Sequence, residues 1–90
     1  MYSEETLKQL SNLGALGYSC EKCMNVLDIE DEKAFTKDFN NPTSVVGKAY
    51  QKGVDKADYA IDSKLFQKAR EGDLKALEKY EQRKHEQKHR

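Results

Sequence analysis

Two pairs of side chains in this sequence have the types and spacing of metal ligands. Cys20 and Cys23 are three positions apart, and His85 and His89 are four positions apart, so each pair would share one face of a helix. Residues 24–84 separate the two pairs, whereas about a dozen residues do so in a zinc finger. We therefore predict no metal site and no cofactor. Cys23 is expected to be a small core residue and Cys20 a half-exposed thiol.

No other set of residues predicts catalysis. The sequence offers no nucleophile with a base, no paired carboxylates on an apolar segment and no glycine-rich phosphate loop after a strand. Asp55, Asp58 and Asp62 share a helical face, but Lys52 and Lys56 surround them at spacings that favour a solvated salt-bridge face. We therefore expect a protein that is not an enzyme.

The composition favours a small helical or oligomeric protein. The 90 residues amount to one domain, and apolar residues make up only 37% against 36% charged. No run approaches eighteen apolar residues, and no basic segment precedes an apolar one at the start. We therefore expect no membrane contact. Because the chain has only two cysteines, we also expect a reducing, cytoplasmic location.

The charge is balanced overall but not locally. Sixteen basic residues match sixteen acidic ones, yet residues 1–47 carry four Lys against eight acids, and residues 48–90 carry twelve basic residues against eight acids. An acidic first half and a basic second half permit head-to-tail contacts between subunits. They equally permit contact between the tail and phosphate groups.

Helix signals divide the first forty residues into three short segments. Ser3, Ser19 and Asp31 are each suited to begin a helix, because their side-chain oxygens can accept from the first backbone amides. Apolar residues recur at helical spacing after each of them. The glycines of residues 14–17 and the Asn-Asn-Pro of residues 40–42 are typical helix ends.

A long helix is predicted next, over about residues 43–71. Asn41 or Thr43 can begin it, with Pro42 suited to a first helical turn. At 1.5 Å per residue the helix would be roughly 43 Å long, which exceeds the width of a globule of this size. One apolar stripe, in steps of three and four, comprises Val46, Tyr50, Val54, Ala57, Ile61 and Leu65.

Glycines mark the interior and the end of this helix. Gly47 and Gly53 each disfavour a helix interior by about 1 kcal/mol, so the helix either bends there or packs closely against another element. Gly72 has the place of a left-handed residue at a helix end, and Asp73 can cap a short last helix.

The stretch of residues 19–40 has the length pattern of a helix-turn-helix unit. A short helix is followed by the turn Asp28-Ile29-Glu30 and a second short helix, over residues 31–40, in the recognition position. We therefore predict an all-α protein. It would have a three-helix helix-turn-helix head over residues 1–41 and a helical oligomerisation segment with a basic C-terminal tail over residues 42–90.

Several short motifs follow one another in an order shared with a known family. In the first half these are Gly17-Tyr18-Ser19, Leu27-Asp28-Ile29, Pro42 and Ala49-Tyr50-Gln51-Lys52-Gly53. In the second half they are Leu65-Phe66, Gly72-Asp73, Ala76-Leu77 and Gln82-Arg83-Lys84. In this order the chain resembles phage terminase small subunits and related small phage helix-turn-helix proteins, from Leu7 to Lys84.

The resemblance implies a non-catalytic component of a viral DNA-packaging motor in the host cytoplasm. Several copies would assemble into a homo-oligomeric ring, recognise double-stranded DNA and pass it to a large ATPase-nuclease subunit. On the recognition helix, Lys33 and Lys37 would contact phosphates, and Thr36 and Asn40 are able to read base edges.

The charges depart from this pattern. Glu30, Asp31, Glu32 and Asp38 share the recognition helix and its turn, so its face carries at least as much negative as positive charge. Either each subunit binds DNA weakly and multivalency compensates, or the basic tail binds instead. The tail's candidate DNA contacts are Lys79, Arg83 and Lys84, although its cations equally suit a solvated helix end.

The apolar stripe of the long helix has no partner of matching length in its own chain. We therefore expect neighbouring subunits to cover it, which makes its six residues the predicted oligomer interface. Two alternatives remain open: a structural or adaptor oligomer that does not bind DNA, and a transcriptional regulator with the same head.

Overall fold

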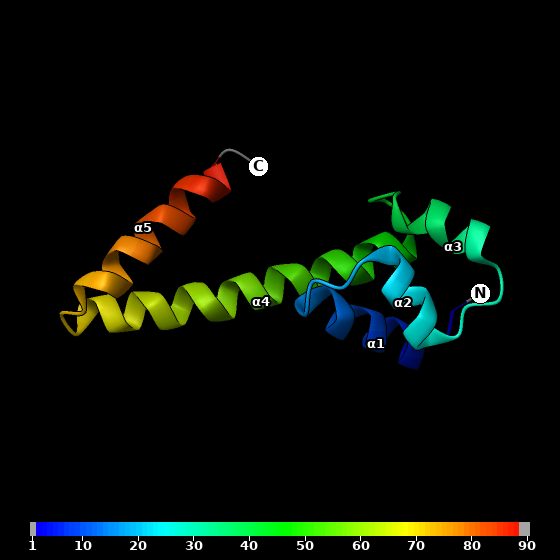
Figure 1. Cartoon of the computed structure of the whole chain (residues 1–90), viewed down its shortest axis with the longest axis horizontal. Coiled ribbons are helices and arrows are strands. Elements are labelled where there is room, and N and C mark those ends of the chain that lie inside the picture. The colour runs from blue at the N-terminus through cyan, green and yellow to red at the C-terminus, as the bar shows by residue number, and fades with distance from the viewer. Residues whose placement is uncertain (1, 89–90) are drawn as a thin grey trace. The chain divides into compact units, whose positions relative to one another are not determined.

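The computed structural model describes residues 2–88, with side chains described to residue 86, and the regular structure in that range is helical (Figure 1). This confirms the predicted all-α class. The helices are α1 (Glu4–Ala15), α2 (Cys20–Leu27), α3 (Glu32–Phe39), α4 (Val45–Arg70) and α5 (Leu74–Lys88).

Contacts divide the chain into two compact units, and the division falls inside α4. The head unit is Met1–Ala57, and the hairpin unit is Asp58–Arg90. The head unit therefore extends beyond the boundary predicted after residue 41, because the first turns of α4 contribute to its core.

A side-chain oxygen caps the start of each helix. The hydroxyls of Ser3 and Ser19 accept from Thr6 N at 3.1 Å and Lys22 N at 3.2 Å, and carboxylates do the same in α3 and α5. The cap of α4 differs from the expectation. Ser44 Oγ accepts from Gly47 N at 2.9 Å, so α4 begins after Pro42 and Thr43 rather than at them.

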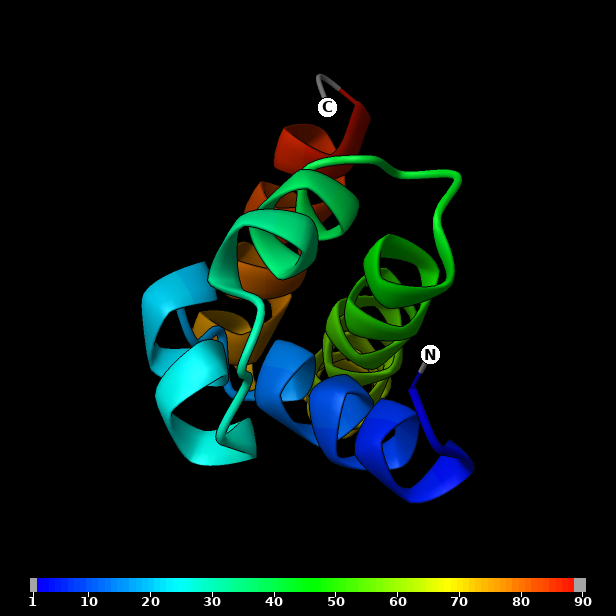
Figure 2. The ribbon, with the colours of Figure 1, turned by 90° about the vertical axis from the view of Figure 1, so that its right-hand side faces the viewer.

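The core of the head unit takes buried side chains from α1 to α4. Figure 2 shows the ribbons of these helices, with α1 in blue, α2 in cyan and α3 and the start of α4 in green. They are Leu10, Leu13, Cys23, Phe35 and Val46. Phe35 is completely buried and begins a series of ring contacts, to Phe39 at 6.0 Å and onward from Phe39 to Tyr50 at 4.6 Å. The hydroxyl of Tyr50 donates to the carbonyl of Tyr18 at 2.7 Å, which ties α4 to the loop between α1 and α2.

Two glycines let the backbones of α1 and α4 touch. A Cβ atom on Gly14 would lie 2.2 Å from the carbonyl oxygen of Tyr50, and one on Gly53 would lie 1.7 Å from that of Ser11. Both distances are far below van der Waals contact. Of the two roles open to Gly53, bending and close packing, the structure therefore shows close packing.

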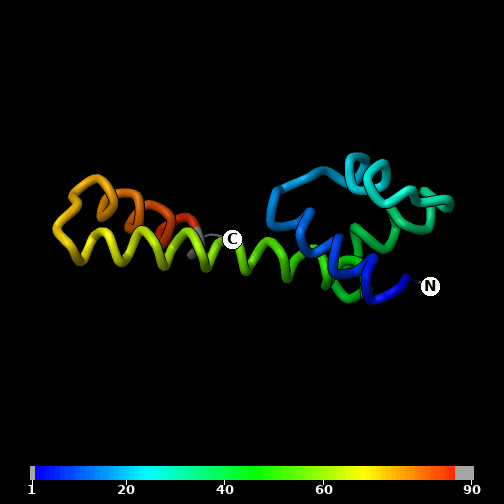
Figure 3. The backbone as a smooth tube through the Cα atoms, turned by 90° about the horizontal axis from the view of Figure 1, so that it is seen from below, coloured from blue at the N-terminus to red at the C-terminus, as the bar shows by residue number. Residues whose placement is uncertain are grey.

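The hairpin unit consists of the last turns of α4 and the whole of α5, joined by Glu71–Asp73 (Figure 3). Gly72 has the left-handed φ of 97° that its position predicted. The rings of Phe66 and Tyr80 lie 5.4 Å apart across the hairpin. Among the described residues of this unit only Ala76 is buried.

Candidate nucleic-acid interface

The connection between α2 and α3 fixes the direction of α3. Asp28 has φ 53° and ψ 50°, a left-handed conformation that ends α2, and the amide of Ile29 donates to Met24 O at 3.1 Å. Asp31 then starts α3 by accepting from Ala34 N at 3.1 Å. With Cys23 and Phe35 both buried, α2 and α3 are held by one core.

One face of α3 points away from that core and carries the four residues predicted to contact DNA. Lys33, Thr36, Lys37 and Asn40 are exposed and recur at positions i, i+3, i+4 and i+7. Phe35, on the opposite side, is completely buried. The structure therefore brings the four residues together on one face, which we call the α3 face.

A shallow, open groove covers part of the α3 face. It is lined by Lys33, Thr36, Lys37, Glu32 and Met24. The hydroxyl of Thr36 contacts Met24 Sδ at 3.7 Å, which orients it towards α2. Met24 was missed by sequence reasoning, although its place on the apolar stripe of α2 was a signal for contact with α3.

The four negative charges near α3 differ in their position relative to the α3 face. Asp38 is half-buried. The pKa of Tyr2 is raised, mainly by the burial of Tyr2 itself and to a smaller extent by the negative charges of Asp38 and Asp31. Asp38 therefore acts on the side of α3 near Tyr2, away from the α3 face. Asp31 accepts from Ala34 N as the helix cap and keeps its charge, Glu30 is exposed in the turn before it, and Glu32 lies in the groove beside the lysines.

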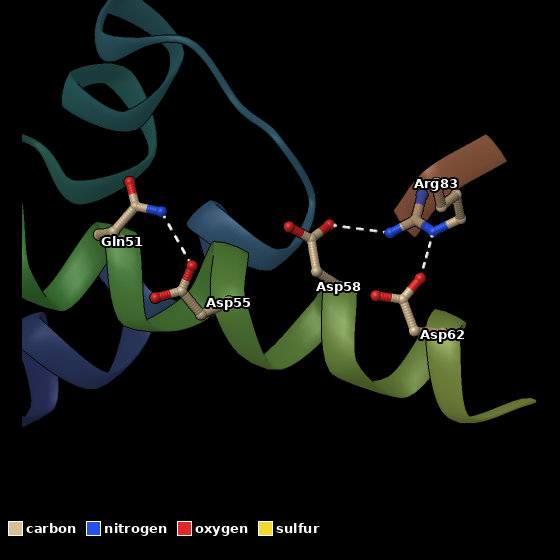
Figure 4. Close-up of polar contacts among 5 residues, drawn as sticks. All are labelled: Gln51, Asp55, Asp58, Asp62 and Arg83. Carbon is tan, nitrogen blue, oxygen red and sulfur yellow. Dashed lines mark hydrogen bonds and ion pairs between the residues drawn. The ribbon is translucent and has the colours of Figure 1, made fainter. Parts of the chain in front are cut away.

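The basic tail contributes fewer available cations than predicted. Lys79 and Lys84 are exposed, and Lys84 Nζ lies 5.9 Å from the centre of the Tyr80 ring. Arg83 is bound within the hairpin unit: Nη2 lies 3.1 Å from Asp58 Oδ1, and Nε donates to Asp62 Oδ1 at 2.5 Å (Figure 4).

This pairing revises two expectations. Arg83, predicted as a DNA contact, has its guanidinium occupied by carboxylates of its own chain, and the bond to Asp62 raises the pKa of Arg83 further. Asp58 and Asp62, predicted to form a solvated face with lysines, instead hold α5 to α4. The sequence does not identify Arg83 as the partner of Asp58 and Asp62, because their pairing depends on how α5 is aligned with α4 in the hairpin. Gln51 and Asp55, one turn apart on α4 in the head unit, bond to each other at 3.0 Å.

The predicted oligomer stripe is largely covered by its own chain. Val46 is 1% exposed, so it is a core residue and not a subunit contact. Tyr50 is half-buried and bonded to Tyr18, and Val54, Ala57 and Leu65 are also half-buried. Of the six residues, Ile61 alone is well exposed, at 47%.

The cysteine pair lies inside the head unit. Cys23 is buried, and burial, followed by the neighbouring Cys20, raises the pKa of its thiol. Cys20 is half-buried, and its Sγ donates to Thr36 Oγ1 at 3.9 Å. Within residues 2–88 no group of three or more His, Cys, Asp or Glu is placed to hold a metal ion, and His89 lies outside the described residues.

Comparison with protein-family models, curated proteins and solved structures finds no match to this chain. Among the described helices, none has the length and apolar character needed to cross a membrane.

Proposed function

We propose that this chain is a non-catalytic, DNA-binding component of a viral genome-packaging complex, and that it binds double-stranded DNA through the α3 face. The observation that carries the proposal is the position of Lys33, Thr36, Lys37 and Asn40 on one exposed face opposite a buried Phe35. Lysines suit phosphate contacts, and Thr and Asn can hydrogen-bond to base edges in the major groove.

The path of the chain before α3 supports a helix-turn-helix reading. DNA-binding units of this kind join two short helices through a three- or four-residue turn that often contains glycine. Here Asp28–Asp31 forms the connection, and Asp28 takes the left-handed conformation for which glycine is usually selected. α1 contacts α2 and packs against α4 through Gly14, and so supports the helix-turn-helix unit formed by α2 and α3.

The small number of cations predicts weak binding by one copy. Lys33 and Lys37 are the only lysines on α3, and Glu32 lies beside them in the groove. Because two phosphate contacts give little affinity at physiological salt, useful affinity requires several linked copies. We therefore propose that the chain acts as a homo-oligomer.

The assignment to packaging rests on the resemblance to terminase small subunits described above. In that role the oligomer would work in the host cytoplasm and pass DNA to a large ATPase-nuclease subunit. Co-expression with the large subunit of the same virus tests this part, and we expect the two proteins to purify together. DNA binding without such a complex would instead favour a transcriptional regulator.

DNA binding is tested by fluorescence anisotropy with a duplex of about two helical turns, over a range of salt concentrations. The Lys33→Glu/Lys37→Glu variant should lose roughly tenfold or more in affinity, and the slope of log affinity against log salt should fall by about two. The matched control is Lys8→Glu/Lys52→Glu, which makes the same charge change at exposed sites on α1 and α4.

The control should bind with nearly the affinity of the wild type. Equal losses in both variants would mean that only overall charge matters and would reject the α3 face. Absence of binding by the wild type at low salt would reject the DNA-binding function and favour an adaptor. Circular dichroism at 222 nm confirms that each variant is folded.

A further inference from the structure

We propose that the hairpin unit docks against the hairpin unit of a second copy of this chain through one apolar face, which we call the aromatic face. This face comprises Tyr59, Phe66, Leu74, Leu77 and Tyr80. The proposal deepens the homo-oligomer of the proposed function by naming its contact surface, and it rests on that assembly but not on DNA binding.

The residues of the aromatic face form one side of α4 and an arc of about 120° around α5. On α4, Tyr59 and Phe66 are seven positions apart, which is two helical turns. On α5, Leu74, Leu77 and Tyr80 follow at intervals of three. The contact between Phe66 and Tyr80, with ring centres 5.4 Å apart, joins the two stripes into one surface.

Most side chains of the aromatic face are exposed to solvent. Tyr59 is 74% exposed, Leu74 73%, Phe66 46% and Leu77 39%. Side chains of this size expose roughly 400 Å² of apolar surface in total at these fractions. The largest apolar patch on a typical monomer covers about 300–600 Å² and is often functional, so a patch of this size on one small unit is a candidate contact surface.

The hairpin unit has only a small core of its own, with Ala76 as the one buried side chain among its described residues. Asp58–Arg90 is shorter than the roughly 40 residues below which a unit needs disulfides, metals or oligomerisation. Both cysteines of the chain are at positions 20 and 23, outside this unit. No metal-binding group occurs in the part of the chain that the structure describes. Association with a second copy would bury more of the apolar surface of this unit.

The charges around the aromatic face favour a second copy over a strongly charged partner. Arg70 lies over the Phe66 ring at 5.8 Å and Lys84 over the Tyr80 ring at 5.9 Å. Glu81 lies on the same side of α5 as Lys84, four positions after Leu77 and three before Lys84. A rim with both signs can pair with a rotated copy of itself, as a two-fold interface requires.

The area also fits a second copy. A standard interface covers about 800 Å² on each partner, of which a little over half is apolar. About 400 Å² of apolar side chain with a polar rim therefore matches one side of a small symmetric interface. A second hairpin unit would complete a four-helix arrangement with the apolar stripes inside.

The test measures the mass of the full chain in solution by sedimentation velocity over micromolar concentrations. The variant Tyr59→Glu/Leu77→Glu places two charges on the aromatic face. Its matched control, Ile61→Glu/Gln82→Glu, adds two charges at exposed positions outside it, one of them on the predicted stripe. Circular dichroism reports whether helicity is kept, and Tyr59→Gln/Leu77→Gln replaces the first variant if it is not.

We expect the wild type and the control to associate, and the aromatic-face variant to sediment as a monomer with unchanged helicity. An associated aromatic-face variant would overturn this inference. If the control alone dissociated, the proposed assembly would stand and its contact surface would be the stripe through Ile61. A wild type that is monomeric throughout would reject both the assembly and this surface, while leaving DNA binding by the head unit to its own test.

Discussion

The head unit and the hairpin unit use apolar side chains in opposite ways. The head unit buries residues from four helices around Phe35 and brings the backbones of α1 and α4 into contact at Gly14 and Gly53. The hairpin unit buries only Ala76 among its described residues and leaves large apolar side chains exposed. One unit therefore stabilises itself and positions a polar face, whereas the other leaves an apolar face exposed.

The largest effect is expected from Phe35→Ala. Removing this completely buried ring should lower the free energy of unfolding of the head unit by about 4 kcal/mol. The equivalent change in the hairpin unit, Phe66→Ala, removes a ring that is 46% exposed and should cost about 1 kcal/mol. Urea unfolding followed by circular dichroism measures both, and similar losses would break the contrast between the units.

The second largest effect is expected from Gly53→Ala, which should lower the free energy of unfolding of the head unit by about 2–3 kcal/mol. Alanine normally favours a helix over glycine, but here its Cβ would meet the Ser11 carbonyl at 1.7 Å and force α1 away from α4. Gly17→Ala is the control, because nothing lies within 4 Å of the Cβ it would add. Its left-handed φ of 72° is unfavourable for alanine and should lower the free energy of unfolding by only about 1 kcal/mol. A stabilised Gly53→Ala variant in thermal unfolding would show that the two backbones do not touch.

Arg83→Met tests the polar contacts that hold α5 to α4 in the hairpin unit. Loss of the bonds to Asp58 and Asp62 should free α5 by about 1 kcal/mol, which raises the exchange rate of its amide hydrogens roughly fivefold. Lys84→Met, at an exposed neighbour, should leave the rates nearly unchanged. Exchange in the head unit should not respond to either substitution.

The smallest effect is a loss of head-unit stability at high pH. Burial raises the pKa of Cys23, Tyr2 and Tyr50 above their ordinary values of 9.0, 10.0 and 10.0. Because the folded state holds these protons longer, their contribution is complete below pH 9 and is lost as the pH rises through 9 and then 10. Thermal unfolding between pH 7 and 11 should show the decline, and Tyr50→Phe should reduce it.

Local signals in the sequence predicted the helices well, because capping and chain reversal depend on neighbouring residues. Ser3, Ser19, Asp31 and Asp73 cap the helices that they were expected to cap, and Gly72 has its predicted left-handed φ. The α3 face was also predictable, since helical spacing alone places its four residues together.

What could not be predicted depends on contacts between distant parts of the chain. The periodicity of α4 marks Val46 as apolar but does not reveal that it joins a core with residues of α1, α2 and α3. The pairing of Arg83 with Asp58 and Asp62 requires the register of the hairpin, which the turn at Gly72 does not specify. The partial burial of Asp38 likewise follows from packing near Tyr2 and not from its own position on α3.

The most direct test of the central claim, that the head unit binds DNA through the α3 face, is a DNA titration followed by amide resonances of the isotope-labelled chain. We predict that the largest shifts occur at Lys33, Thr36, Lys37 and Asn40 and weaken as salt is added. Shifts confined to the tail, around Lys79 and Lys84, or no shifts at low salt, would contradict the claim.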